Sequence, residues 1–171
     1  FKMRMSNVGR PTCQLWYQKN KPEVALPFPN TFIMNMMLGD IVEAVFKGVL
    51  KEAGVRYEDS EKVSLDCGDT VVNGSYDIVI NDAVDDIKSA SDWSYRNKFA
   101  SGDGFGYIGQ LAGYAKASGK KVGGWWVVNK ANGALKYVPA TGLDLEAEVQ
   151  KIKETVNKVK ENKFERCFEP V

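Results

Sequence analysis

The feature that most constrains the fold is a change of hydrophobic period partway along the chain. Residues 34–54 carry apolar side chains at helical spacing, among them Met37, Ile41 and Val45, and this pattern ends at Gly54. From residue 62 to residue 88 the spacing approaches two, as it does in strands, and turn-forming pairs interrupt it at 68–69, 73–74 and 81–82. A helix followed by a meander of about three strands predicts an α/β domain.

The remaining pattern completes one domain, residues 1–171, with a central mixed sheet of about five strands flanked by helices. Helices are predicted within 6–17, over 107–119 and over 143–164, and a hairpin over 123–140. Loops are predicted over 20–30, which is rich in proline, and over 93–106. The stretch "SGDGFG" at 101–106 lacks the Lys-Ser/Thr of a phosphate-binding loop, so we expect a flexible loop near the site.

The composition excludes several kinds of chemistry. The chain has no histidine, which removes Ser-His and Cys-His nucleophile pairs and histidine-ligated zinc. The net charge of +1 provides no overall basic field for nucleic acid. Three widely spaced cysteines, Cys13, Cys67 and Cys167, predict neither a disulfide framework nor a zinc site, which favours a reducing compartment. No run of 18 apolar residues occurs, so we expect a cytoplasmic protein without a membrane partner.

Acidic residues stand among apolar ones between Gly74 and Ser91. Residues two apart on a strand share a face, so Asp86 and Lys88 are predicted to project together, away from Asp85. A turn at 81–82 would bring Asp77 towards Asp86. Two carboxylates beside a lysine suit Mg²⁺ or Mn²⁺. The alternative is a solvent-facing hairpin with an ordinary salt bridge, worth about 0–1 kcal/mol.

The spacing Asp77, Asp86, Lys88 resembles the signature of the PD-(D/E)XK nuclease superfamily, and "GSYD" resembles its preceding strand. Glu43, four residues after Gly39, resembles the acidic helix motif of RecB-like and phage-type exonucleases. Many RecB-like members carry histidine where this chain has Glu43. Gln110 and Tyr114, at i and i+4 on the later helix, resemble the additional motif of RecB-like nucleases, although such a pair is also common at the edge of an ordinary core.

The resemblance implies a role for each matching position. Asp77 and Asp86 would bind the metal, with the Ile87 carbonyl and Glu43 as further ligands, and Lys88 would be the catalytic lysine. The residues implied to contact DNA or support the site are Gln110, Tyr114, Ser89 and Ser91, the two serines being expected as exposed hydroxyls beyond the strand. Some relatives hold an iron–sulfur cluster on four cysteines, but three cysteines without a C-terminal cluster predict none here.

The implied function is a Mg²⁺- or Mn²⁺-dependent DNA exonuclease of recombination or repair in a bacterium or a phage-infected host. It would act on single-stranded DNA or duplex ends, and a recombination or single-strand-binding protein and a homo-oligomer are open as partners. Two alternatives stand beside it. One is a structure-specific or restriction-type endonuclease, and the other is a non-catalytic DNA-binding module that retains the fold.

Overall fold

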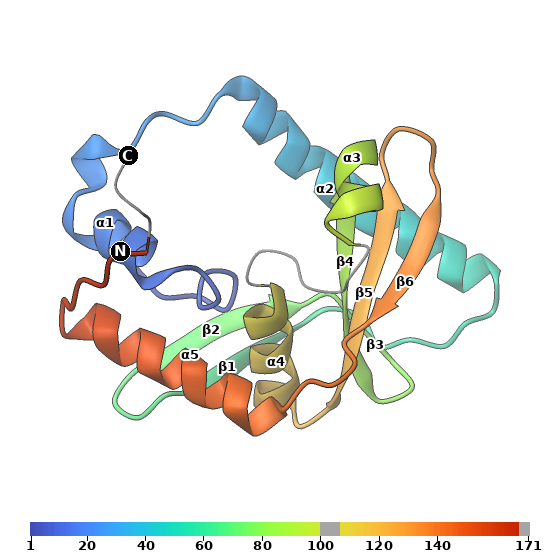
Figure 1. The fold of residues 1–171 in the computed structure, drawn as a ribbon. Coiled ribbons are helices and arrows are strands. Elements are labelled where there is room, and N and C mark those ends of the chain that lie inside the picture. The colour runs from blue at the N-terminus through green and yellow to red at the C-terminus, as the bar shows by residue number, and fades with distance from the viewer. Residues whose placement is uncertain (100–106, 168–171) are drawn as a thin grey trace.

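The chain folds into two β-sheets with helices packed around them (Figure 1). The computed structural model describes residues 1–99 and 107–167. Six strands are present among these residues: β1 (Glu61–Asp66), β2 (Val71–Tyr76), β3 (Ile78–Ile80), β4 (Ala83–Ala90), β5 (Lys121–Asn129) and β6 (Leu135–Pro139). Strands β1 and β2 form an antiparallel pair, and the other four form a mixed sheet in the order β3-β4-β5-β6, in which only β4 and β5 are parallel.

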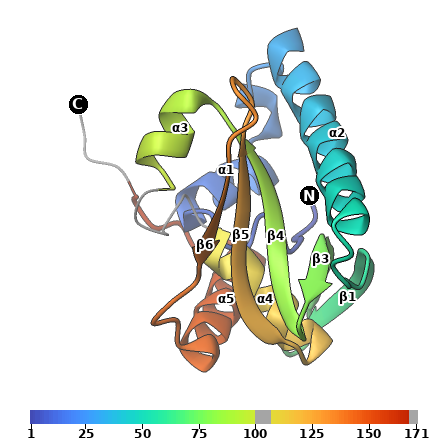
Figure 2. The same cartoon turned by 90° about the vertical axis from the view of Figure 1, so that its right-hand side faces the viewer.

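Helices cover both faces of the four-stranded sheet (Figure 2). The helical segments are α1 (Thr12–Asn20), the short 3₁₀ turn η1 (Pro22–Val24), α2 (Asn30–Glu52), α3 (Asp92–Asn97), α4 (Tyr107–Ser118) and α5 (Leu145–Lys160). Helix α2 packs its C-terminal half on one face through Phe46 and Leu50, which meet Ile78 and Ile87 of the sheet. Helices α4 and α5 pack on the other side, over a larger core.

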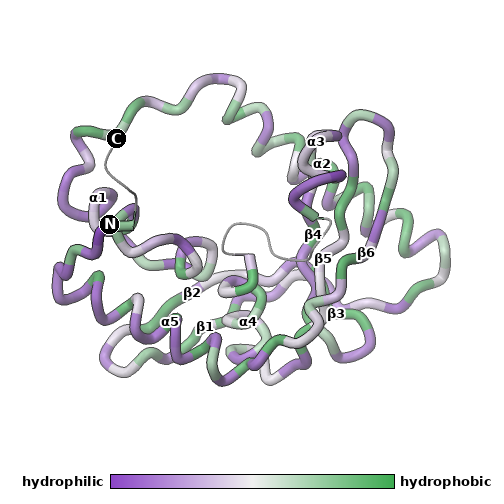
Figure 3. The backbone as a smooth tube through the Cα atoms, in the orientation of Figure 1, coloured by the Kyte–Doolittle hydropathy of each residue, from purple (hydrophilic) through white to green (hydrophobic). Residues whose placement is uncertain are grey.

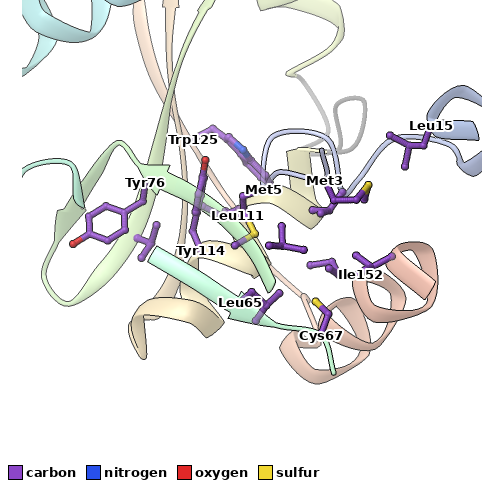
Figure 4. Packing of buried hydrophobic residues seen from close by; sticks show 14 of the residues in the cluster. Met3, Met5, Leu15, Leu65, Cys67, Tyr76, Leu111, Tyr114, Trp125 and Ile152 are labelled. Atoms are coloured by element: carbon purple, nitrogen blue, oxygen red, sulfur yellow. The ribbon is translucent and has the colours of Figure 1, made fainter. Parts of the chain in front are cut away.

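The larger core fills the space between both sheets, α4, α5 and the N-terminal segment (Figure 4). Trp125 of β5, Leu111 and Tyr114 of α4, and Met5 are almost fully buried there. Gly74 of β2 allows this close packing, since a Cβ at that position would lie 2.6 Å from Met5 Cβ and 2.9 Å from Tyr114 Cε1. The strand that precedes Asp77 is therefore fixed directly against the helix that carries Tyr114.

Most predicted elements are confirmed, but the predicted turn at 73–74 is wrong, because Asn73 and Gly74 lie inside β2 and pair with β1. The sheet is mixed and flanked by helices as expected, but it has four strands rather than five because β1 and β2 separate from it. Helix α2 begins at residue 30, earlier than its amphipathic pattern indicates. The predicted loop from residue 93 contains α3, whose first turn is capped by the Ser91 side chain. The predicted flexible loop at 101–106 lies outside the described residues.

The expectation for the cysteines is wrong in one respect. Cys13 of α1 and Cys167 form a disulfide, with their Cα atoms 6.0 Å apart, because α1 packs beside α5 and so brings the two ends of the described chain together. Trp16 assists this pairing by donating from its indole nitrogen to the Asn162 carbonyl. Cys67 is buried in the larger core. A reducing compartment was favoured because no disulfide was predicted, and the Cys13–Cys167 disulfide removes that reason.

None of the described helices is both long enough and apolar enough to span a membrane.

Candidate active site

The two predicted carboxylates are brought together by the β3–β4 hairpin. Its turn is formed by Asn81 and Asp82, both with positive φ (51° and 64°), as the predicted turn requires. The register pairs Ile78 with Asp85 and Ile80 with Ala83, so its continuation by one residue places Asp77 opposite Asp86. The Asp77 carboxylate is fixed there because its Oδ2 accepts a hydrogen bond of 2.8 Å from the Ile87 amide.

Asp77 and Asp86 form a pair of like charges in which Asp86 is buried and Asp77 is half-buried. Asp86 is 3% exposed, and the two carboxyl groups lie within hydrogen-bonding reach of each other. Burial, the hydrogen bond with Asp86 and repulsion from that carboxylate raise the pKa of Asp77 well above its ordinary value. Such a pair is stable only when one member is protonated or a cation lies nearby.

Lys88 supplies one positive charge to this pair. Its Nζ lies 2.6 Å from Asp86 Oδ2, as the shared strand face predicts. Burial by itself would lower the lysine pKa, but attraction to Asp86 outweighs it, and the net effect is a raised pKa. The ammonium also lies 4.3 Å from the centre of the Tyr107 ring, in a cation–π contact.

The predicted pair on α4 contacts the lysine directly. Gln110 Oε1 accepts a hydrogen bond of 3.3 Å from Lys88 Nζ, and Gln110 Nε2 donates one of 3.3 Å to the Tyr114 hydroxyl. Tyr114 is 4% exposed, and burial raises its pKa. A continuous polar chain therefore runs from Asp86 through Lys88 and Gln110 to Tyr114.

Glu43 is engaged elsewhere in this structure. Its Oε1 pairs with Lys47 one turn later on α2 at 2.9 Å, and Lys47 in turn pairs with Asp59 at 2.7 Å. Glu43 reaches the site only electrostatically, by adding to the rise in the Asp77 pKa. Over residues 1–99 and 107–167, no three Cys, Asp or Glu side chains gather into a ready-made metal site.

The two serines lie differently from the exposed hydroxyls expected for them. Ser89 is a half-buried residue within β4, not beyond the strand, and its hydroxyl lies next to α2, 3.7 Å from the position of a Cβ at Gly39. It therefore lies on the α2 side of β4, whereas Lys88 contacts α4. Ser91 follows the strand, but its Oγ accepts a hydrogen bond of 3.2 Å from the Ser94 amide as the cap of α3. Because the Ser89 hydroxyl lies against α2 and the Ser91 hydroxyl caps α3, neither is the exposed group that was predicted to contact phosphate.

Asp85 is a site-related residue that sequence reasoning left without a role. One residue of β4, Asp85, stands opposite two of β5, Gly123 and Gly124, where the register shifts in a β-bulge. The Asp85 carboxylate accepts hydrogen bonds from the Gly124 amide (2.8 Å), the Tyr137 hydroxyl (2.8 Å) and the Trp126 indole (3.1 Å). A Cβ at Gly123 would collide with this carboxylate and lie 2.7 Å from the Val84 carbonyl. The consecutive glycines inside a strand were the available signal.

A surface cavity of about 520 Å³ adjoins this site. Tyr107 and Gln110, which both contact Lys88, form one wall, and the N-terminal segment forms the other through Arg10 and Gln14. The cavity thus places a cation and an amide beside the polar chain described above. Arg10 was not a predicted site residue, because nothing in its local sequence connects it with β4 or α4.

The residues fit a hard divalent cation on two observations. Asp77 and Asp86 concentrate two carboxylates at one point, and Asp86 Oδ2 accepts no well-formed hydrogen bond from the described residues, its ion pair with Lys88 apart. Magnesium and manganese prefer such oxygens and retain waters in their other positions. The Ile87 carbonyl and Glu43 stay predictions as further ligands.

Comparisons with known proteins bear on the fold. No family model matches the chain, and no curated protein matches its sequence. Among solved structures, the crystal structure of SSO0001 is similar, with a TM-score of 0.59 and 19% sequence identity over 91% of this chain and 74% of that chain. At this identity the similarity indicates a shared arrangement of helices and strands and carries no statement about activity.

Proposed function

We propose that the chain is a metal-dependent nuclease that hydrolyses DNA phosphodiester bonds, acting as an exonuclease in recombination or repair. One observation carries this proposal: Asp77, Asp86 and Lys88, which match a nuclease signature in the sequence, meet at one point, with Asp86 buried, next to Gln110 and Tyr114. An ordinary surface salt bridge would not explain a buried carboxylate that faces a second, half-buried one.

Asp77 and Asp86 would hold the cation, which would polarise the scissile phosphate and activate a water molecule. Asp77 is oriented for this by the Ile87 amide, and Asp86 by its contact with Lys88. The role of each remaining residue follows from its contacts.

Lys88 is a donor in this scheme. Its raised pKa keeps it as an ammonium, which suits it to donate hydrogen bonds to phosphate oxygens as they gain negative charge. Gln110 and the Tyr107 ring restrict where the ammonium can point. Both residues also line the cavity that contains Arg10, which offers room and a positive charge for the nucleotide strand beside the lysine.

The decisive experiment is digestion of end-labelled linear DNA with Mg²⁺, with Mn²⁺ or with chelator. We expect cleavage with either metal, none in chelator, and a loss of about 10²–10⁴-fold in Lys88→Ala. Lys116→Ala is the matched control, because Lys116 of α4 pairs with Glu146 on the surface. Cleavage that persists undiminished in chelator would contradict the proposal.

Circular single-stranded DNA separates the alternatives. An exonuclease leaves the circle intact, whereas an endonuclease opens it, and a non-catalytic module only binds it. Opening of the circle by wild type, with loss of that activity in Lys88→Ala, would replace exonuclease by endonuclease and retain the site. Binding without cleavage of any substrate would reject the enzymatic proposal altogether.

A further inference from the structure

Helix α2 exposes an unusual amount of apolar surface. Every residue from Asn30 to Leu38 is exposed, and no charged residue occurs between Val24 and Gly39. Hydrophobic positions recur along the backbone of α2 (Figure 3). The large apolar residues of α2 that are 40–61% exposed are Phe32, Ile33, Met34, Met36, Met37, Leu38, Ile41, Val45 and Val49. At about 200 Å² for a large apolar residue, these expose roughly 900 Å². Apolar patches of this size on soluble proteins mark interaction sites.

The patch has a regular geometry. Ile33, Met37, Ile41, Val45 and Val49 follow one another at four-residue intervals and form a single ridge along the helix. The ridge is centred on Ile41, on the side opposite Phe46 and Leu50, which pack against the sheet. Ile33 and Val49, both β-branched, end the ridge at equal distances from Ile41. The ridge is therefore nearly symmetric about Ile41.

A groove lies beside the C-terminal half of this ridge. Ile41, Val45 and Val49 form one wall, and Val128 and Leu135 of the β5–β6 hairpin form the other. The groove has a volume of about 330 Å³, and Leu135 is 45% exposed at its edge. The N-terminal half of the same ridge, with Ile33 and Met37, projects without burial. One helix thus carries both an apolar projection and an apolar groove.

We infer that the occupant of this groove is α2 of a second copy of the chain, packed antiparallel across a twofold axis near Ile41. This arrangement places Ile33 of each copy against Val49 of the other, and Met37 against Val45. Ridges at four-residue spacing pack into each other's grooves at about 50°. The projection of each copy then fills the groove of the other, which is the self-complementarity that a twofold interface requires.

Charge and area favour this occupant over others. The ridge residues from Ile33 to Val49 are all apolar and offer no cation to nucleic-acid phosphates. Lys47 of the same helix pairs with Glu43 and Asp59, whereas an interfacial membrane helix typically turns lysine or arginine towards lipid headgroups. The apolar residues on the ridge side of α2, without Phe32 and Met36 on the opposite side, expose roughly 750 Å² on each copy, which is close to the roughly 800 Å² per partner of a stable interface. This interface is independent of the proposed nuclease activity, because it uses none of the residues around Lys88.

The test is the oligomeric state of the whole chain by sedimentation at several concentrations. We expect a dimer for wild type, and at least about tenfold weaker association for Met37→Lys and for Val45→Glu, each of which places an unpaired charge in the interface. Val71→Glu is the matched control, because Val71 of β2 is 52% exposed away from α2. Its dimer should be unchanged.

A charge-pair experiment tests the register. When Met37→Lys and Val45→Glu proteins are mixed, the antiparallel pairing sets the new lysine against the new glutamate at one contact and leaves Val45 against Met37 at the other. We expect the mixture to dimerise more tightly than either variant does alone. A wild type that stays monomeric at every concentration, an equal loss in Val71→Glu, or a mixture that dimerises no more tightly than either variant would each overturn the inference.

Discussion

Asp85 and Asp86 are neighbours on β4 with the same exposure, 3%, yet their surroundings differ completely. The Asp85 carboxylate accepts three hydrogen bonds, from an amide, a hydroxyl and an indole. Asp86 on the opposite face meets a second carboxyl group and one lysine. The hydrogen bonds that the Asp85 carboxylate accepts all come from the protein itself. Among the described residues Asp86 lacks such donors, and a buried carboxylate without enough donors is where a cation from solution would bind.

The largest effect on activity is expected for Asp77→Asn, which tests whether the Asp77–Asp86 pair is the cation site. The amide oxygen can still accept from the Ile87 amide and the Lys88–Asp86 pair is kept, so the fold should be unchanged or slightly more stable. Cleavage of linear DNA should fall roughly 10³-fold, the order expected when one charge-stabilising group is removed. Asp82→Asn in the turn of the same hairpin is the control, because Asp82 pairs with Lys120 outside the site. Unchanged cleavage in Asp77→Asn would remove this carboxylate from the site.

Asp85→Asn should instead reduce stability. The amide nitrogen would face a donor, since the indole, hydroxyl and backbone groups around it all donate. We expect a loss of about 2 kcal/mol in the free energy of unfolding and a fall in Tm of about 4–8 °C. Tyr137→Phe removes only one donor and should cost less. If Asp85→Asn were as stable as wild type, the bulge would not depend on this carboxylate.

The pH dependence of the free energy of unfolding distinguishes Asp77 from Asp85, which lie on opposite faces of the sheet. Burial raises the pKa of both Asp77 and Asp85, so each contributes stability that is present below its unfolded pKa of about 4 and is lost as pH rises through the raised value. Urea unfolding of wild type, Asp77→Asn and Asp85→Asn between pH 4 and 8 should give a shallower decline in each variant.

Divalent metal sharpens the same measurement. Saturating Mg²⁺ or Mn²⁺ should abolish the fall in stability with pH that Asp77 causes, because Asp77 faces the proposed cation. The fall that Asp85 causes should remain, because Asp85 lies on the other face of β4. An equal effect of metal on the decline in wild type and in Asp77→Asn would show that the cation binds elsewhere.

The smallest effect is expected for Tyr114→Phe. The ring stays buried, and only the hydrogen bond from Gln110 is lost, which is long at 3.3 Å. A loss of about 0.5–1 kcal/mol corresponds to a few-fold reduction in cleavage. Gln110→Ala should reduce cleavage more, because Gln110 also contacts Lys88. The reverse order would indicate that the tyrosine hydroxyl acts directly on the substrate.

The sequence by itself determined most of the elements and the side-chain faces of β4. Periodicity predicted the helices over 34–54 and 107–119, and alternation placed Asp86 with Lys88 and apart from Asp85. The turn pair Asn81 and Asp82 set the hairpin register that brings Asp77 opposite Asp86. These are local properties, because backbone conformation and strand alternation depend on residues near in sequence.

Only the tertiary structure decided what each of these side chains meets. The separation of β1 and β2 from the main sheet, the pairing of Cys13 with Cys167 and the engagement of Glu43 by Lys47 depend on segments that pack against one another. The three donors around Asp85 come from two other strands. Such contacts are set by which surfaces pack together in three dimensions, and no local pattern around the residue itself encodes them.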